Sequence, residues 1–163
     1  MLLNKGTLTS LSTFSEYVRP QEQKYLSEFC TELTGIHQYD VDSARTLDEV
    51  LHAVGRWLDR NIRGQAYDSI LPVTCGDWDL KTMLPTEAWR KRLTYHPSLH
   101  WWCNVKPVFR LRTQLQGRCD LMEMIQHLQI EHTGRHHSGI DDVRNLVAII
   151  HEREFARGLT PPL

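Results

Sequence analysis

Apolar residues recur at spacings of three and four between residues 46 and 60, which is the pattern of an amphipathic helix. Thr46 and Glu49 stand at the start of this run in the spacing of a capping box, where a hydroxyl and a carboxylate satisfy free backbone amides of the first turn. The pattern predicts a helix that begins at Thr46 and presents one apolar stripe to the core, made of Val50, Leu51, Val54, Trp57 and Leu58.

Other segments have weaker helical patterns. Residues 21–34 carry polar and apolar side chains in helical order and stop at Gly35, a residue type that commonly ends helices. We also expect helices over three later ranges: 80 to about 92 with an interruption near Pro85, 121–130, and 140 to about 157.

Strands are predicted between these helices. Residues 12–18 are rich in β-forming side chains and are closed by Pro20, so we expect a hairpin of two strands within residues 2–19. A short buried strand is predicted over residues 70–74 and a further strand over 101–109. Because early strands are followed by helices that alternate with strands, this order favours a single α/β or α+β domain.

Length and composition are those of an ordinary globular protein. The chain has 163 residues, 40% hydrophobic and 24% charged, so we expect one domain over residues 1–158 with a flexible tail at 159–163. No segment approaches the ~20 apolar residues of a membrane helix, and the first apolar run is too short for a secretory signal. The four cysteines form no Cys-x-x-Cys pair, which favours reduced thiols in an intracellular protein of unresolved compartment. A net charge of −1 excludes a polycation that coats nucleic acid.

The most informative chemistry lies just before the last predicted helix. His137 precedes Asp142 by five residues, and Asp142 opens an apolar helical run. The Ser138–Gly139 joint between them lets the imidazole turn toward the carboxylate. This pairing is typical of a metal-dependent hydrolase, in which the carboxylate holds a cation and the imidazole takes a proton from water.

Asp79 is a second candidate ligand. It follows the predicted strand 70–74, and ligands collect where chains leave the strands of an open α/β sheet. Asp77 and Asp79 flank Trp78, so one acid can bind a ligand while the other caps the next helix. For Asp79 considered alone, helix capping is the commoner role.

The remaining histidines add little to the prediction. His132, His136 and His137 lie close in sequence, but Gly134 interrupts the helix that would align their rings, so we expect no zinc site. His151 is predicted to lie on the solvated side of the last helix.

Several motifs together resemble the DEDDh family of 3′-to-5′ exonucleases. The similar stretches are Phe14–Pro20, Leu26–Ile36, Val41–Asp42, Thr74–Leu80 and Gly134–Asp142. They are most similar to the subgroup that trims 3′ ends of histone messenger, small and ribosomal RNAs, including its prion-interactor-like members. The resemblance covers about residues 8–155 and implies a ribonuclease H-like α/β fold, a mixed sheet flanked by helices.

The resemblance also implies roles for individual residues. Asp79 and Asp142 match acids of the second and third exonuclease motifs and would bind Mg²⁺ or Mn²⁺, and His137 matches the general base. The pocket around the terminal base of a single-stranded RNA 3′ end would contain Phe29, Leu33 and Trp78. Such side chains offer stacking worth about 1–3 kcal/mol per base. The alternative for Phe29 and Leu33 is ordinary core packing, since they lie one helical turn apart.

The sequence departs from the family at the first motif. No Asp-x-Glu pair precedes Glu16, the first acid, and the start of the chain resembles the family's second strand. The expected fold therefore lacks the first, central strand, which leaves open sheet edges where a protein partner can add a strand. Three explanations compete: a truncated sequence, a degenerate fold kept for binding, and a partner chain that supplies the strand. We favour the first two over intact catalysis.

The expected function is that of a 3′-to-5′ exoribonuclease family member with weak or no activity as this chain alone. The alternatives are a catalytically degenerate RNA-binding or assembly subunit and a purely structural interaction domain. No membrane partner is expected.

Overall fold

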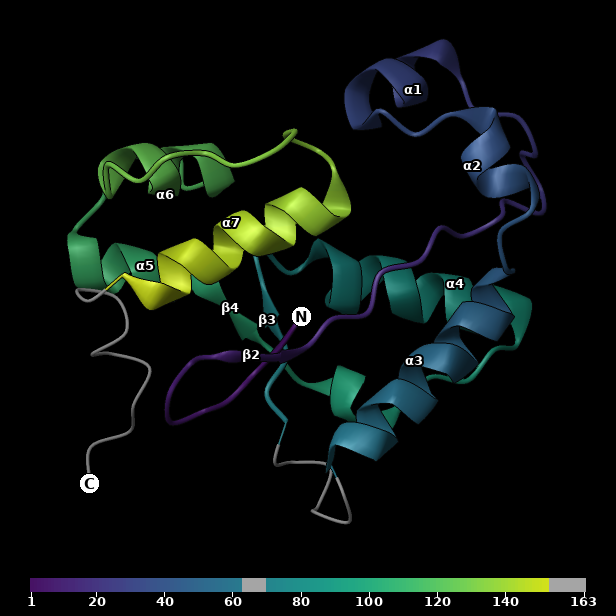
Figure 1. Cartoon of the computed structure of the whole chain (residues 1–163), viewed down its shortest axis with the longest axis horizontal. Helices are drawn as coiled ribbons and strands as arrows, with labels where there is room; N and C mark the ends of the chain where they lie inside the picture. Colours follow the sequence, from purple (N-terminus) through teal and green to yellow (C-terminus); the bar gives the residue numbers. More distant parts are fainter. Residues whose placement is uncertain (63–69, 153–163) are drawn as a thin grey trace. The chain divides into compact units, whose positions relative to one another are not determined.

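The computed structural model describes residues 1–62 and 70–152, and the chain divides into two compact units. The middle unit is Phe14–Cys103, and the terminal unit combines Met1–Thr13 with the chain from Asn104 onward. Figure 1 labels helices α1 to α7 and strands β2, β3 and β4. Each unit is described by itself below.

The longest helix of the middle unit is α3 (Leu47–Ile62), which confirms the helix predicted from the apolar stripe. Its capping box is present: the Thr46 backbone N–H donates to Glu49 Oε2 at 2.7 Å, and the Glu49 N–H donates to Thr46 Oγ1 at 3.4 Å. Its buried side chains are Val50, Leu51, Ala53, Leu58 and Ile62. The aromatic ring of Phe14 packs against Trp57 with centroids 5.8 Å apart.

Helix α1 (Glu28–Thr34) is shorter than the predicted helix over 21–34. Ser27 begins it with extended backbone, and Gly35 ends it in the left-handed region at φ 75°, as predicted. The preceding segment is held instead by Gln38, which accepts from the Leu26 N–H at 2.8 Å and donates to the Lys24 carbonyl at 3.0 Å. Gln38 begins a short helix that the pattern did not predict, α2 (Gln38–Asp42).

A strand and three helical segments complete the middle unit. Strand β3 (Val73–Thr74) pairs with β4 (Cys103–Asn104), and the Cys103 N–H donates to the Pro72 carbonyl at 2.8 Å. A π-helix, η2 (Trp78–Met83), continues into α4 (Leu84–Lys91), and a 3-10 turn, η3 (Pro97–His100), follows. The change from π to α geometry occurs beside Pro85, where the helix was predicted to be interrupted.

The terminal unit begins with a hairpin that is shorter than predicted. Strands β1 (Leu2–Leu3) and β2 (Ser10–Ser12) pair antiparallel, and no strand continues over residues 13–17. His151 is exposed, as predicted, and its Nε2 also donates to the Leu8 carbonyl at 2.7 Å. This bond ties the hairpin loop to the end of the last helix.

The strand predicted over residues 101–109 is largely wrong, because this segment forms helix α5 (Val105–Thr113) after the two residues of β4. Asn104 caps the helix by accepting from the Lys106 N–H at 3.1 Å. Pro107 lies in the first turn, where a missing N–H is tolerated. Val105 and Phe109, one turn apart, are both buried. Capping and burial at helical spacing thus outweigh the β propensity of the segment.

Helices α6 (Leu121–His127) and α7 (Gly139–His151) pack against each other in the terminal unit (Figure 1). Their predicted positions are confirmed, although α6 ends before Ile130 and residues 153–157 lie outside the described residues. The buried side chains of the pair are Leu121, Met124, Ile125, Asn145, Leu146, Ile149 and Ile150. This packing fixes the two ends of the loop that carries the candidate site.

The α/β class is confirmed. Within residues 1–62 and 70–152 the strands form two small two-stranded sheets. The single domain over 1–158 stays a prediction, and the predicted tail 159–163 lies outside the described residues. None of the described helices is long and apolar enough to cross a membrane.

Candidate functional site

The loop between α6 and α7 is anchored by Asn145, a polar residue buried on the apolar face of α7. Its side chain is paired with the backbone of Thr133 in both directions: Oδ1 accepts from the N–H at 2.9 Å, and Nδ2 donates to the carbonyl at 2.8 Å. Nδ2 also donates to the Asp141 carbonyl at 2.9 Å. Because these groups are satisfied only in this arrangement, Asn145 fixes where the loop returns to the helix.

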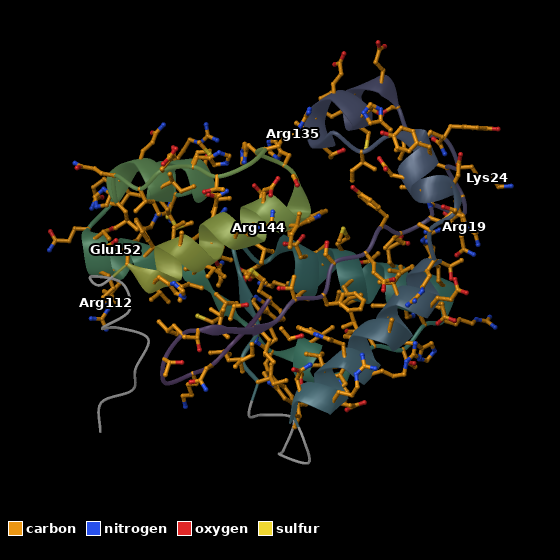
Figure 2. All side chains as sticks on the ribbon, viewed as in Figure 1. Arg19, Lys24, Arg112, Arg135, Arg144 and Glu152 are labelled. Atoms are coloured by element: carbon orange, nitrogen blue, oxygen red, sulfur yellow. The ribbon has the colours of Figure 1, made fainter. Side chains whose placement is uncertain are left out.

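A second anchor holds the turn at Gly134. This glycine has φ 75°, and a Cβ added to it would lie 2.4 Å from Asp141 Cγ, so a larger residue would strain the backbone and displace the Asp141 side chain. Asp141 accepts from the Arg135 N–H at 3.1 Å and from the Arg144 guanidinium at 2.8 Å. Figure 2 labels Arg135 in the loop and Arg144 on α7. The backbone bond from Arg135, followed by bonds from Ser138 and Arg144, lowers the pKa of Asp141 from its ordinary value.

These two anchors place His136 beside Asp142. His136 directly precedes His137, the predicted general base. His136 Nδ1 donates to Asp142 Oδ1 at 3.2 Å, with the two side chains 40% and 30% exposed. His137 has φ 67° and is exposed, and its ring lies against that of His136, tilted by 33° with centroids 3.9 Å apart. The role of His137 as general base stays a prediction.

His132 completes a cluster on the same loop. Its ring meets that of His136 edge-on, with centroids 6.2 Å apart, and its Nε2 is buried with no hydrogen-bond partner among the described residues. One ligand atom each of His132, His136 and Asp142 lie within 4.8 Å of one another. The expectation that Gly134 keeps these histidines apart is wrong, because the turn at Gly134 brings the two rings together.

Asp79 lies in the middle unit, in the first turn of η2, and is exposed. The N-cap position belongs to Asp77, so the capping alternative for Asp79 is wrong. Asp77 makes no capping bond with its side chain, and its Oδ1 accepts from the Trp102 indole N–H at 2.9 Å. The Asp79 carboxylate therefore faces solvent.

The predicted base-contacting residues also lie in the middle unit and are exposed. Phe29 and Leu33 on α1 are 70% and 38% exposed, and Trp78 at the start of η2 is 67% exposed. Core packing, the alternative for Phe29 and Leu33, is wrong because neither is buried. Their exposure leaves these side chains accessible to a ligand, and their contact with a base stays a prediction.

The donor chemistry of Asp79 and Asp142 fits the predicted cation, since carboxylate oxygens are the ligands that Mg²⁺ prefers. Asp79 belongs to the middle unit and Asp142 to the terminal unit, so their convergence stays a prediction. The carboxylate of Glu16, the first acid of the chain, is paired with Arg45 at 3.3 Å.

Comparison with known proteins agrees with the resemblance. A family model described as Exonuclease matches residues 3–150. Human ERI1 exoribonuclease 3 is 38% identical over 154 residues, which cover 91% of this chain and 44% of that protein. Human 3′-5′ exoribonuclease 1 is 35% identical over 150 residues, covering 91% of this chain and 43% of that protein. The chain thus spans less than half the length of these curated relatives.

Solved structures have the same fold. The nuclease domain of 3′hExo, described as a DEDDh family member bound to rAMP, has a TM-score of 0.83 and 34% identity, covering 90% of this chain and 74% of that chain. A 3′-exonuclease in a structure describing recognition of the histone mRNA stem-loop has a TM-score of 0.85 and 29% identity, covering 96% and 54%. The predicted ribonuclease H-like fold is confirmed by these similarities.

Proposed function

We propose that this chain, which belongs to the DEDDh family of 3′-to-5′ exoribonucleases, takes part in removing nucleotides from the 3′ ends of single-stranded RNA by metal-dependent hydrolysis. The observation that carries the proposal is Asp142, which lies in the first turn of α7 with a 30% exposed side chain beside an imidazole. A solvent-accessible carboxylate next to histidines offers a cation ligand and a proton acceptor.

In this proposal Asp79 and Asp142 would hold Mg²⁺ or Mn²⁺ through their carboxylate oxygens. When bound, such an ion stabilises charge on the phosphate and lowers the pKa of water. His137 accepts the proton of the attacking water, and its exposed ring lies against that of His136. His136 orients the carboxylate of Asp142 through the 3.2 Å hydrogen bond.

The terminal nucleotide is assigned to the exposed side chains of Phe29, Leu33 and Trp78. Stacking on an aromatic side chain tolerates any base, which suits an enzyme that removes successive nucleotides. The names of the relatives describe exoribonucleases, and this supports RNA as the substrate. An RNA substrate fits an intracellular location, as do cysteines that are thiols rather than disulfides.

A non-catalytic RNA-binding or assembly subunit is the second candidate. One observation favours it: Phe29 and Trp78 are 70% and 67% exposed, and such side chains can stack on bases whether or not hydrolysis follows. Asp79 and Asp142 alone would hold at most one cation. The attacking and leaving oxygens would then not be stabilised together by a pair of metal ions. The exposed stacking side chains would still bind RNA.

The test is hydrolysis of a 5′-labelled single-stranded RNA by the purified 163-residue chain with Mg²⁺ or Mn²⁺. We expect slow loss of 3′ nucleotides, because a general base alone typically contributes only about 10²–10⁴-fold. Asp142→Asn should abolish this loss, and an RNA with a blocked 3′ end should resist it.

Binding of the RNA without any metal-dependent hydrolysis would favour the non-catalytic candidate. The absence of both binding and hydrolysis would overturn the proposed function. Rapid hydrolysis that Asp142→Asn abolishes would support the enzyme and reveal a further ligand from another position or a partner chain.

A further inference from the structure

We infer that His132, His136 and Asp142 form a binding site for a divalent transition-metal ion of the zinc class. The site lies wholly within the terminal unit, where the α6–α7 loop meets the start of α7. Its donor set of imidazole and carboxylate differs from the all-oxygen set expected for Mg²⁺.

The spacing of the donor atoms suits a single ion. Ligands that bind zinc at roughly 2.0–2.2 Å in a tetrahedral arrangement lie about 3.3–3.6 Å from one another. His136 Nδ1 and Asp142 Oδ1 are already 3.2 Å apart, and the whole set lies within 4.8 Å. Small side-chain rotations would close the set around an ion, with coordination replacing the His136–Asp142 hydrogen bond.

The nitrogen of His132 gives independent support. Its Nε2 is buried with no hydrogen-bond partner in the described part of the chain. A buried polar atom without a partner is unfavourable and uncommon in folded proteins. Coordination of a metal ion through Nε2 of His132, together with His136 and Asp142, would give this nitrogen a partner.

The loop holds the ligands before any ion binds. Asn145 fixes the backbone of Thr133, next to His132, with bonds of 2.9 and 2.8 Å. Asp141 holds the turn between the two histidines by accepting from the Arg135 N–H at 3.1 Å. Ligands that are positioned in advance lose little conformational entropy on binding.

The site also has room for a ligand from solvent. The His136 and Asp142 side chains are 40% and 30% exposed, so an ion held by three protein ligands can keep a water molecule in its fourth position. Imidazole ligands suit Zn²⁺ and related ions better than Mg²⁺. Excess Mg²⁺ should therefore not displace the bound ion.

One consequence rests on the proposed function. Asp142 would be a ligand in both sites, so an ion held by the two histidines would withdraw this carboxylate from the catalytic cation. Zinc-class ions would then inhibit the proposed exonuclease even with Mg²⁺ in excess.

The experiment is a titration of the metal-free full chain with Co²⁺, followed by its visible absorption, and then with Zn²⁺ as competitor. We expect binding of one ion per chain without the near-ultraviolet band of sulfur-to-cobalt charge transfer, since no cysteine is a ligand. His132→Gln and His136→Gln should each weaken Co²⁺ binding by more than about tenfold. Loss of a residue that only hydrogen-bonds a metal ligand already costs about that much, and these two residues would bind the ion directly. His52→Gln is the matched control, since His52 is an exposed histidine on α3 of the middle unit, and this variant should bind as the wild type does.

The absence of Co²⁺ binding by the wild type, or unchanged binding by His132→Gln, would overturn the inference. Should a variant fail to fold, imidazole resonances of the wild type are followed by nuclear magnetic resonance during Zn²⁺ addition. Shifts at His132 and His136 but not at His151 would support the site, and unshifted resonances would overturn it. None of these readouts uses RNA, so failure of the proposed exonuclease function would be seen separately.

Discussion

His136 Nδ1 lies 3.2 Å from Asp142 Oδ1, whereas the ring of the next residue, His137, makes no hydrogen bond among the described residues. His137 has a positive φ of 67°, and its exposed ring lies against that of His136 with centroids 3.9 Å apart. One imidazole therefore faces the carboxylate, and the other is presented to solvent. We therefore expect different tasks for the two neighbours: positioning or metal ligation for His136, and proton transfer for His137.

Asp79 and Asp142 are expected to converge, since a shared pair of metal ions about 3.5–4 Å apart needs carboxylates within reach of both. An experimental structure of the chain with Mn²⁺ and a nucleotide would measure the separation. A distance above roughly 10 Å between the two carboxylates, too long to share a metal pair, would contradict the proposed site.

Trp78→Ala should weaken the binding of a short single-stranded RNA, because stacking on one aromatic side chain contributes about 1–3 kcal/mol, or about 5–150-fold in Kd. Fluorescence anisotropy at fixed salt concentration measures the change. Trp89→Ala is the matched control, since Trp89 is 84% exposed on α4 and has no assigned contact with RNA. Equal affinities of wild type and Trp78→Ala would remove Trp78 from the nucleotide surface.

Gly134→Ala should destabilise the terminal unit by roughly 1–3 kcal/mol, because the new methyl group meets Asp141 and the backbone is left-handed. Thermal and urea unfolding measure the loss. Gly117→Ala separates the effect of the left-handed backbone from that of the contact with Asp141. Gly117 also has a positive φ, 83°, but an added Cβ there would meet nothing within 4 Å. A loss no larger than that of Gly117→Ala would mean that the contact with Asp141 contributes nothing.

The depressed pKa of Asp141 makes the anchoring of the loop dependent on pH. A carboxyl group whose pKa is lower in the folded state stabilises the fold above its unfolded pKa of about 3.9. That stabilisation is lost as the pH falls through the lower folded value. The stability difference between wild type and Asp141→Asn should therefore be largest near neutral pH and shrink below about pH 4. Unfolding by urea across this range measures it, and a constant difference would show that the charge of Asp141 has no part in the anchor.

Features that depend on neighbours in sequence could be predicted without the structure. The capping box of Thr46 and Glu49, the apolar stripe of α3 and the stop at Gly35 are local, because backbone bonds and helical spacing determine them within a few residues. The motifs that identify the family are equally local, so membership and the candidate acids Asp79 and Asp142 could be read from the chain.

Features that depend on distant contacts were decided only by the tertiary structure. Residues 21–27 are not helical because Gln38, beyond the next helix, binds their backbone. Residues 105–109 combine apolar and β-forming side chains, and burial of Val105 and Phe109 on one face settled helix over strand. The proximity of His132, His136 and Asp142 depends on the turn at Gly134 and on the hydrogen bonds of Asn145. The spacing of residues in the sequence determines neither the direction of a loop nor the partner of a buried amide.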